Sequence, residues 1–258
     1  MAIKWESITN ESEKLFLKTV NEYTIKSEAQ SRELYTDFYE IDWMKSIIAK
    51  HFGKYMQDRY KFIGGYEYAE RGVLACLPYD EAYDVPITIL KIEVKTGIGK
   101  PLSHRDFLGS LLGLGIERNK IGDIITKPFG AYVIAHSDIG EFIRWNLTQI
   151  GRYSQVESSI ITEDLLEIEP PKFKEITGTV ASLRVDAVFS LAFGISRTSC
   201  DKLLEQGKGK SSGTIINSSY KIEAGEVLTL RGYGKIRIKD IAGMSKKQRT
   251  YITVERYI

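Results

Sequence analysis

The N-terminal third of the chain combines helical and alternating apolar patterns. Leu15, Phe16 and Val20 stand at helical spacing, and a further amphipathic run follows before the first glycine pair. Two short β-rich runs then flank Gly64-Gly65, which is typical of two strands joined by a turn. Residues 1–80 are therefore expected to form a small α/β module. The predicted elements are a helix over residues 1–30, a helix over 42–52, and strands over 60–63 and 71–77.

The middle of the chain alternates β-rich and helical patterns in the order strand, helix, strand, strand, helix, strand. This order is that of the ferredoxin-like fold, which RNA-recognition modules also use. The paired aromatic motif of a true RNA-recognition sheet is missing, so the fold by itself assigns no function. Residues 81–165 are predicted to form this domain. Its elements are a strand over 87–94, a helix over 103–114, strands over 123–126 and 131–135, a helix over 137–150, and a strand over 153–161.

The last part of the chain follows a segment with Pro170-Pro171 and mixed charges, so residues 162–178 are predicted to be a linker. Two helices are expected to pack on a small sheet in residues 179–258, which makes the whole chain α+β. The predicted elements are helices over 184–193 and 197–206 and strands over 215–216, 220–222, 227–230, 235–238 and 250–254.

Charge is distributed unevenly along these 258 residues. The whole chain has 36 Lys+Arg and 34 Asp+Glu, a net charge of +2. Residues 179–258 hold 14 of the basic and 7 of the acidic residues, a net +7, which leaves −5 for residues 1–178. A basic segment of domain size is typical of nucleic-acid binders, although an ordinary solvated surface also fits an excess of seven charges.

Several classes of protein are excluded by composition. No run of 18 apolar residues exists, so we expect no transmembrane helix, and the polar N-terminus lacks the apolar core of a secretory signal. Two cysteines, Cys76 and Cys200, cannot form a disulfide framework or a four-ligand zinc site, and both are expected to be buried thiols. A reducing, cytosol-like compartment is therefore expected.

The segment over residues 183–208 carries the most specific pattern. It runs Leu183-Arg184-Val185-Asp186, then an apolar helix, then Ser196-Arg197 opening a second helix that ends at Gly207. This pattern resembles the RNA-binding domain named after the fourth small-subunit ribosomal protein, in which the first turn of the second helix and the following strands face RNA. The free N–H groups of a helix N-terminus favour phosphate. The alternative is a structural hairpin in which Asp186 pairs with a nearby arginine.

The chain departs from that domain after Gly207. The family usually has a Val-x-Val-Asn strand and turn there, whereas residues 208–212 read Lys-Gly-Lys-Ser-Ser. Gly and Ser lower strand propensity, so the first strand is expected to be frayed. Further on, Ala224-Gly225-Glu226-Val227 matches the family's Gly-Asp-x-apolar signature, with Glu226 in place of Asp.

Three further stretches resemble the YlmH family, including its cyanobacterial and plastid relatives described as photosystem II assembly proteins. They are residues 64–71 (GGYEYAER), 102–116 (LSHRDFLGSLLGLGI) and 231–235 (RGYGK). The resemblance covers the chain from about residue 34 onward. It implies a non-enzymatic, cofactor-free RNA-binding protein that acts in ribosome quality control on large subunits carrying obstructed peptidyl-tRNA. It places the protein in the cytoplasm, the plastid stroma or the cyanobacterial cytosol, and roles in cell division or photosystem assembly are also attached to the family.

Other motifs admit competing interpretations. His104-Arg105-Asp106 superficially resembles a kinase catalytic loop, but Leu111 stands where the magnesium-binding Asn belongs, and no Asp-Phe-Gly follows. Gly109 and Gly113 do not belong to a phosphate loop. They predict a closely packed helix that another backbone approaches. The group Glu67, Glu70 and Arg71 is interpreted as a surface ion pair rather than as acid–base chemistry, and three scattered histidines predict no metal site.

An RNA-modifying enzyme and a pure protein-assembly factor are the alternatives to RNA binding alone. The domain that would carry a synthase's catalytic aspartate is missing, and no cofactor loop of a methyltransferase is seen. We expect rRNA and tRNA of the large ribosomal subunit as partners, contacted through phosphates and shape, with no DNA, no membrane and a monomeric chain.

Two sets of residues are predicted to contact RNA. Tyr233 is expected either to stack on a base or to pack internally, and residues 246–249 either to contact phosphate or to form a solvated loop. The main set is Arg184, Ser196, Arg197, Thr198, Lys202, Lys208, Lys210, Arg231, Lys235, Lys246, Lys247 and Arg249. A second RNA-facing edge is predicted at His104, Arg105, Arg118, Asn119 and Lys120.

Overall fold

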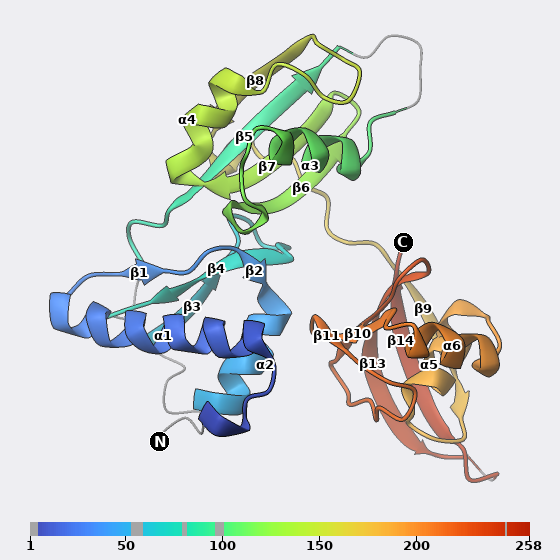
Figure 1. Ribbon diagram of the computed structural model, residues 1–258. Helices are drawn as coiled ribbons and strands as arrows, with labels where there is room; N and C mark the ends of the chain where they lie inside the picture. Colours follow the sequence, from blue (N-terminus) through green and yellow to red (C-terminus); the bar gives the residue numbers. More distant parts are fainter. Residues whose placement is uncertain (1–4, 53–58, 79–81, 96–100, 246) are drawn as a thin grey trace. The chain divides into compact units, whose positions relative to one another are not determined.

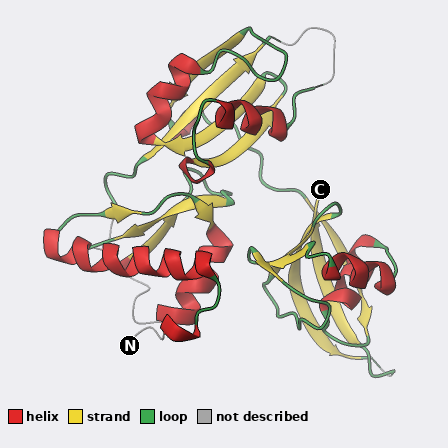
Figure 2. Ribbon diagram, viewed as in Figure 1, coloured by secondary structure: helices red, strands yellow, loops and turns green. Residues whose placement is uncertain are grey.

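The computed structural model describes residues 5–52, 59–78, 82–95, 101–245 and 247–258. The chain divides into two compact units, residues 1–168 and 169–258. Each unit combines helices with antiparallel sheet, which confirms the α+β class (Figures 1 and 2). The first unit holds both the N-terminal module and the ferredoxin-like module. The division of this unit into two separate domains stays a prediction.

The N-terminal module is a small sheet covered by helices. Asn10 caps the long first helix, because its side-chain oxygen accepts a hydrogen bond from the Glu13 N–H at 3.1 Å. The central strand of the sheet pairs with the three others. Two of those are only two residues long and leave no alternating pattern, so they were not predicted. The elements are η1 (Trp5–Ser7), α1 (Glu11–Gln30), β1 (Leu34–Tyr35), β2 (Tyr39–Glu40), α2 (Ile41–Phe52), β3 (Tyr60–Ile63) and β4 (Arg71–Cys76).

The middle module has the predicted ferredoxin-like topology. Its strands lie in the order β6-β7-β5-β8 with every neighbouring pair antiparallel. The two helices pack through Phe107, Leu111 and Ile143 against one face of this sheet. The elements are β5 (Ile87–Val94), α3 (His104–Gly113), η3 (Arg118–Lys120), β6 (Ile121–Lys127), β7 (Gly130–His136), α4 (Ser137–Asn146) and β8 (Val156–Ile161).

The prediction of a closely packed helix at Gly109 and Gly113 is wrong. A Cβ atom added to either glycine of α3 would meet nothing within 4 Å. The close approaches lie elsewhere in this module. At Gly130, which begins β7, a Cβ would come within 2.1 Å of the Ile92 carbonyl oxygen of β5.

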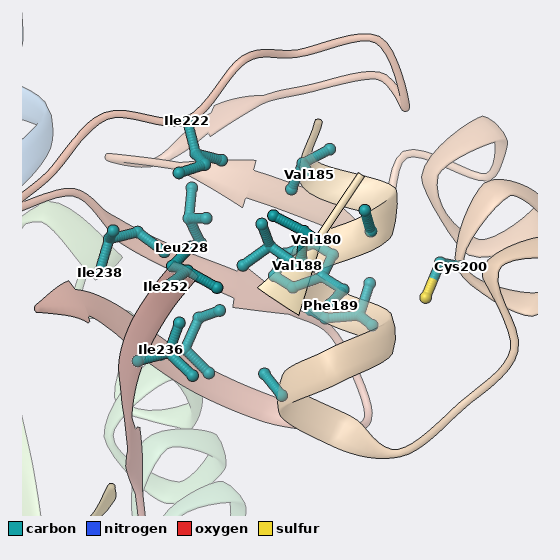
Figure 3. Close-up of a cluster of buried hydrophobic side chains, with 14 of the residues drawn as sticks. Val180, Val185, Val188, Phe189, Cys200, Ile222, Leu228, Ile236, Ile238 and Ile252 are labelled. Atoms are coloured by element: carbon teal, nitrogen blue, oxygen red, sulfur yellow. The ribbon is translucent and has the colours of Figure 1, made fainter. Parts of the chain in front are cut away.

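The C-terminal unit is a six-stranded antiparallel sheet with a helical hairpin on one face. Its strand order is β11-β10-β12-β13-β14-β9. Core residues such as Val188, Phe189 and Ile236 join the hairpin to the sheet (Figure 3). The elements, after η4 (Glu163–Leu165), are β9 (Phe173–Val180), α5 (Val185–Phe193), α6 (Arg197–Glu205), β10 (Gly209–Ser211), β11 (Thr214–Ile215), β12 (Val227–Leu230), β13 (Gly234–Met244) and β14 (Thr250–Tyr257).

Three details of this unit differ from the sequence prediction. Part of the predicted linker is β9, which pairs with β14 from Phe173 to Val180. The segment after Gly207 forms β10 between β11 and β12, because backbone pairing on both sides outweighs its low strand propensity. The strand predicted at 220–222 is reduced to an isolated bridge between Arg184 and Lys221.

Candidate nucleic-acid interface

The helical hairpin of the C-terminal unit presents the start of α6 to solvent. Gly194 ends α5 in the left-handed conformation, with φ of 66°, and so turns the chain toward the second helix. Ser196 caps α6, because its hydroxyl oxygen accepts a hydrogen bond from the Ser199 N–H at 3.1 Å. Arg197 and Thr198 therefore occupy an exposed first helical turn, as predicted from the motif.

A buried carboxylate holds the two arginines of this hairpin. Asp186 is only 1% exposed. It accepts hydrogen bonds from Arg184 Nε at 3.0 Å and from Arg197 Nε at 3.0 Å. Burial alone would raise the pKa of the Asp186 carboxyl, but the bonds from Arg197 and Arg184 outweigh it and lower that pKa. The pairing of Asp186 with a nearby arginine, which the structural alternative predicted, is thus confirmed, while about half of the Arg197 side chain remains exposed.

Four of the predicted cations lie beyond this hairpin and have no carboxylate partner among the residues that the structure describes. Lys202 lies in the last turn of α6. Lys208 precedes β10 and Arg231 follows β12, and the Arg231 N–H donates to the Lys208 carbonyl at 2.9 Å, so these two residues are neighbours. Within the described ranges, none of Lys202, Lys208, Lys210 and Arg231 forms an ion pair. Their charges are therefore available to a ligand.

Other basic residues of the unit are held by internal contacts. Lys239 pairs with Glu175 and, at 3.4 Å, with Glu255, which also accepts from Arg237 Nε at 2.9 Å. The Lys235 ammonium lies 5.3 Å from the centre of the Tyr257 ring. Net charge alone could not distinguish these cations from the unpaired ones.

Arg249 and Lys247, from the predicted basic cluster at residues 246–249, have different surroundings. The Arg249 guanidinium donates to Thr179 Oγ1 at 3.0 Å and to the Thr179 carbonyl at 2.7 Å, which ties it to β9. Lys247 is exposed, and Lys246 lies outside the described residues. Tyr233 packs on Phe193 with ring centres 5.9 Å apart, yet 39% of its surface stays exposed. Packing of Tyr233 is thus confirmed, and stacking on a base stays a prediction.

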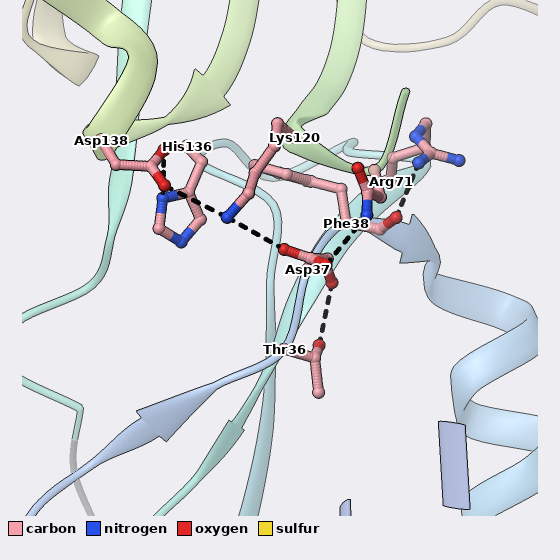
Figure 4. A network of polar contacts seen from close by, with 8 residues as sticks. Thr36, Asp37, Phe38, Arg71, Lys120, His136 and Asp138 are labelled. Atoms are coloured by element: carbon pink, nitrogen blue, oxygen red, sulfur yellow. Dashed lines mark hydrogen bonds and ion pairs between the residues drawn. The ribbon is translucent and has the colours of Figure 1, made fainter. Parts of the chain in front are cut away.

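The second predicted RNA edge contains residues that join the two modules of the first unit. Lys120 lies between Asp37 at 3.2 Å and Asp138 at 3.1 Å, and Asp138 also contacts His136 (Figure 4). Burial acts to lower the pKa of Lys120, but its bonds to Asp138 and Asp37 outweigh burial and raise it. Asn119 Nδ2 also donates to Asp37 at 3.0 Å. The positive charge of Lys120 is therefore neutralised by carboxylates of the protein itself.

Two arginines extend this inter-module network. The Arg71 guanidinium donates to the carbonyls of Phe38 at 2.7 Å and Ile121 at 3.2 Å, and Arg118 donates to Ile121 as well. The pKa of Arg71 is lowered to about 10, mainly by burial and to a smaller extent by the charge of Arg118. Arg71 was predicted to lie in a surface ion pair, but it is partly buried and bridges the modules instead.

The remaining two cationic residues of the predicted edge, His104 and Arg105, begin α3. His104 has a lowered pKa, because it is partly buried and because Arg118 is near. Arg105 lines an open cavity of about 450 Å³ with Gly109, Gly113 and Gln149. His104, Arg105, Arg118 and Lys120 are thus not gathered into one unpaired cationic surface, and their contact with RNA stays a prediction.

Among the described residues, no group of three metal-binding side chains occurs, and none of the helices has the length and apolar character of a membrane span. Cys76 and Cys200 are both buried thiols, as predicted. Burial raises the pKa of Cys76 to about 12 and that of Cys200 to about 11.

The fold defines a modular α+β protein in which a ferredoxin-like sheet precedes a basic unit with a helical hairpin. Residues 78–163 match the family model described as "Putative RNA-binding domain in YlmH". Over 248 residues the chain is 28% identical to the ribosome-associated protein quality control protein P2 of Bacillus subtilis (strain 168), with 95% of each chain covered. These two matches confirm the resemblance to the YlmH family. A solved structure, the cell division protein YlmH from Streptococcus pneumoniae, aligns with a TM-score of 0.47 and 19% identity, covering 60% of this chain and 94% of that one.

Proposed function

We propose that this protein is a monomeric, non-enzymatic RNA-binding factor that acts in ribosome-associated quality control in the cytoplasm. In this proposal it contacts structured rRNA and tRNA on the large ribosomal subunit. The match of residues 78–163 to a YlmH-type RNA-binding domain supports the RNA ligand. The name of the Bacillus subtilis relative supports the ribosome and the quality-control pathway.

The observation that carries the proposal is the cluster of unpaired cations at the end of α6 and the adjoining strands. Lys202, Lys208 and Arg231 have no carboxylate partner within the described residues, although carboxylates neutralise Arg237 and Lys239 in the same sheet. Cations that remain unpaired in the folded protein can displace counterions from phosphates and so gain affinity. Because these contacts are to phosphate, they favour structured RNA by shape rather than by base sequence.

The proposal is tested with the variant Lys202→Ala/Lys208→Ala/Arg231→Ala of the full chain. A matched control is Lys18→Ala/Lys26→Ala/Lys50→Ala, which removes the same charge from α1 and α2. Co-sedimentation with purified large ribosomal subunits is measured over a range of salt concentrations. We expect the first variant to bind more weakly and to lower the salt slope by about 2 to 3, because each lost phosphate contact lowers it by about 1. Equal binding by both variants would contradict the proposed interface.

A further inference from the structure

The face of the C-terminal sheet opposite α5 and α6 carries an aromatic patch, which consists of Phe173, Tyr257, Lys235 and Arg237. On β13 and β14 the residues that alternate with these, Ile236, Ile238, Ile252 and Val254, are buried in the core with the helices. The patch therefore points away from the hairpin. In Figures 1 and 2 both helices lie on one side of this sheet. The described residues of this unit leave the other side open.

The aromatic rings of the patch are held by one another and by cations. Phe173 of β9 is directly opposite Tyr257 of β14 in the register, and their ring centres lie 4.8 Å apart in an edge-to-face arrangement. The Arg237 guanidinium lies 5.2 Å from the centre of the Phe173 ring, and the Lys235 ammonium lies 5.3 Å from that of Tyr257. Phe173 nevertheless keeps 37% of its surface exposed.

Positive charge continues from the patch across the sheet. Lys210 of β10 lies opposite Thr229 of β12, which in turn lies opposite Lys235 of β13. The row therefore runs from an unpaired lysine through a threonine to the aromatic rings. Two carboxylates of this face, Glu175 and Glu255, stand in the next row along and pair with Arg237 and Lys239. Asp240 lies farther along β13, opposite Thr253.

We infer that the aromatic patch binds unpaired RNA nucleotides. An exposed aromatic ring beside cations is the combination that holds single strands, since bases stack on the ring while the cations, here Lys235 and Lys210, attract the phosphates. One base stacks on Phe173 and a neighbouring base contacts Tyr257. The phosphate backbone passes along Lys235 and Lys210. The inference rests on the proposed function and adds a second RNA contact on the face opposite the hairpin.

The test compares two RNA ligands with the full-length protein by fluorescence anisotropy. One is a labelled uridine decamer, and the other is a labelled RNA hairpin with a fully paired stem. The variant Phe173→Leu/Tyr257→Leu keeps apolar bulk on the strands but has no ring on which a base can stack. Its control is Tyr251→Leu, because Tyr251 is 45% exposed on β14. Tyr251 points to the same face roughly 20 Å from Tyr257.

We expect the double variant to bind the decamer at least about fivefold more weakly and the hairpin within about twofold of the wild type. Tyr251→Leu should bind both as the wild type does. A decamer carrying 4-thiouridine should also crosslink to peptides that contain Phe173 or Tyr257.

Each other outcome overturns the inference in a recognisable way. If the wild type binds the hairpin but not the decamer, or if the double variant binds the decamer normally, the patch is not an RNA site and its exposed rings are left for protein contact. If the wild type binds neither RNA, the proposed function fails together with the inference. Loss of hairpin binding in the Lys202→Ala/Lys208→Ala/Arg231→Ala variant alone would uphold the proposed function independently.

Discussion

Asp186 shows how a single buried charge organises the C-terminal helical hairpin. Its carboxylate is removed from water and receives hydrogen bonds from Arg184, which precedes α5, and from Arg197, which begins α6. The pairing therefore ties the two helix starts together. It also positions Arg197 at the exposed turn that the motif predicts to face RNA.

At the residue scale we predict that Asp186→Asn destabilises the hairpin. The change removes the charge that two guanidinium groups surround, and a loss of about 2 kcal/mol is expected for a buried charge-assisted hydrogen-bond acceptor. Native-state hydrogen exchange of α5 amides, such as that of Val188, measures the free energy of opening. An unchanged opening free energy would show that Asp186 is not needed to hold α5 and α6.

We also predict that the difference in stability between the wild type and Asp186→Asn depends on pH. The pKa of Asp186 is lower in the folded protein than in the unfolded chain, so its contribution is complete above the unfolded pKa of about 3.9 and is lost as pH falls through the folded pKa. The stability difference between wild type and Asp186→Asn should therefore be constant above about pH 5 and should shrink below pH 4.

At the scale of elements, glycines have opposite roles in two parts of the middle module. Gly130 has a φ of 150° and lies against the β5 backbone, whereas Gly109 and Gly113 of α3 face open space. A glycine in a helix that nothing approaches only weakens the helix, whereas a glycine against a backbone carbonyl permits strand pairing.

We predict that Gly130→Ala and Gly109→Ala change stability in opposite directions. The first forces a methyl group against the Ile92 carbonyl and should destabilise the module by about 1–3 kcal/mol. The second should stabilise α3 by up to about 1 kcal/mol. Differential scanning calorimetry of the full chain measures both shifts. Destabilisation by Gly109→Ala would mean that the open side of α3 is packed after all.

Two strands of the C-terminal sheet, β10 and β9, show why strand propensity and the Pro-Pro pair gave wrong predictions. Gly209 lies in β10 where a Cβ would come within 2.2 Å of a Leu204 methyl group of α6, so a β-branched residue fits poorly there. Low propensity at this point reflects close packing rather than fraying. Strand β9 likewise follows the Pro170-Pro171 pair, which indicated a linker, and only its pairing partner β14 reveals it as a strand.

At the scale of the whole molecule, the two compact units divide the charge as well as the fold. The boundary lies at residue 169 rather than at 179, and the ten added residues contain two acidic and two basic side chains. The C-terminal unit therefore keeps its net +7. This excess of positive charge, which is typical of nucleic-acid binders, does not depend on the exact boundary.

We predict that a fragment of residues 169–258 folds and that one of residues 179–258 is much less stable. The shorter fragment lacks Phe173–Gly178 of β9, which pair with Ile252–Tyr257, and so exposes β14 as an unpaired edge. Circular dichroism should show its melting temperature lowered by roughly 10 °C or more relative to the longer fragment. Equal melting temperatures would mean that β9 adds nothing to the unit.

The sequence alone determined what depends on local pattern and composition. The ferredoxin-like order follows from periodicities of 2 and 3.6 residues, the basic segment from counting charges, and the hairpin with its Asp186 from one motif. The tertiary structure decided which cations are neutralised. In the described part of the chain, Lys239 meets two carboxylates while Lys208 meets none, and Phe173 meets Tyr257 across 84 residues of sequence. Such pairings depend on the register between distant strands, which no local pattern encodes.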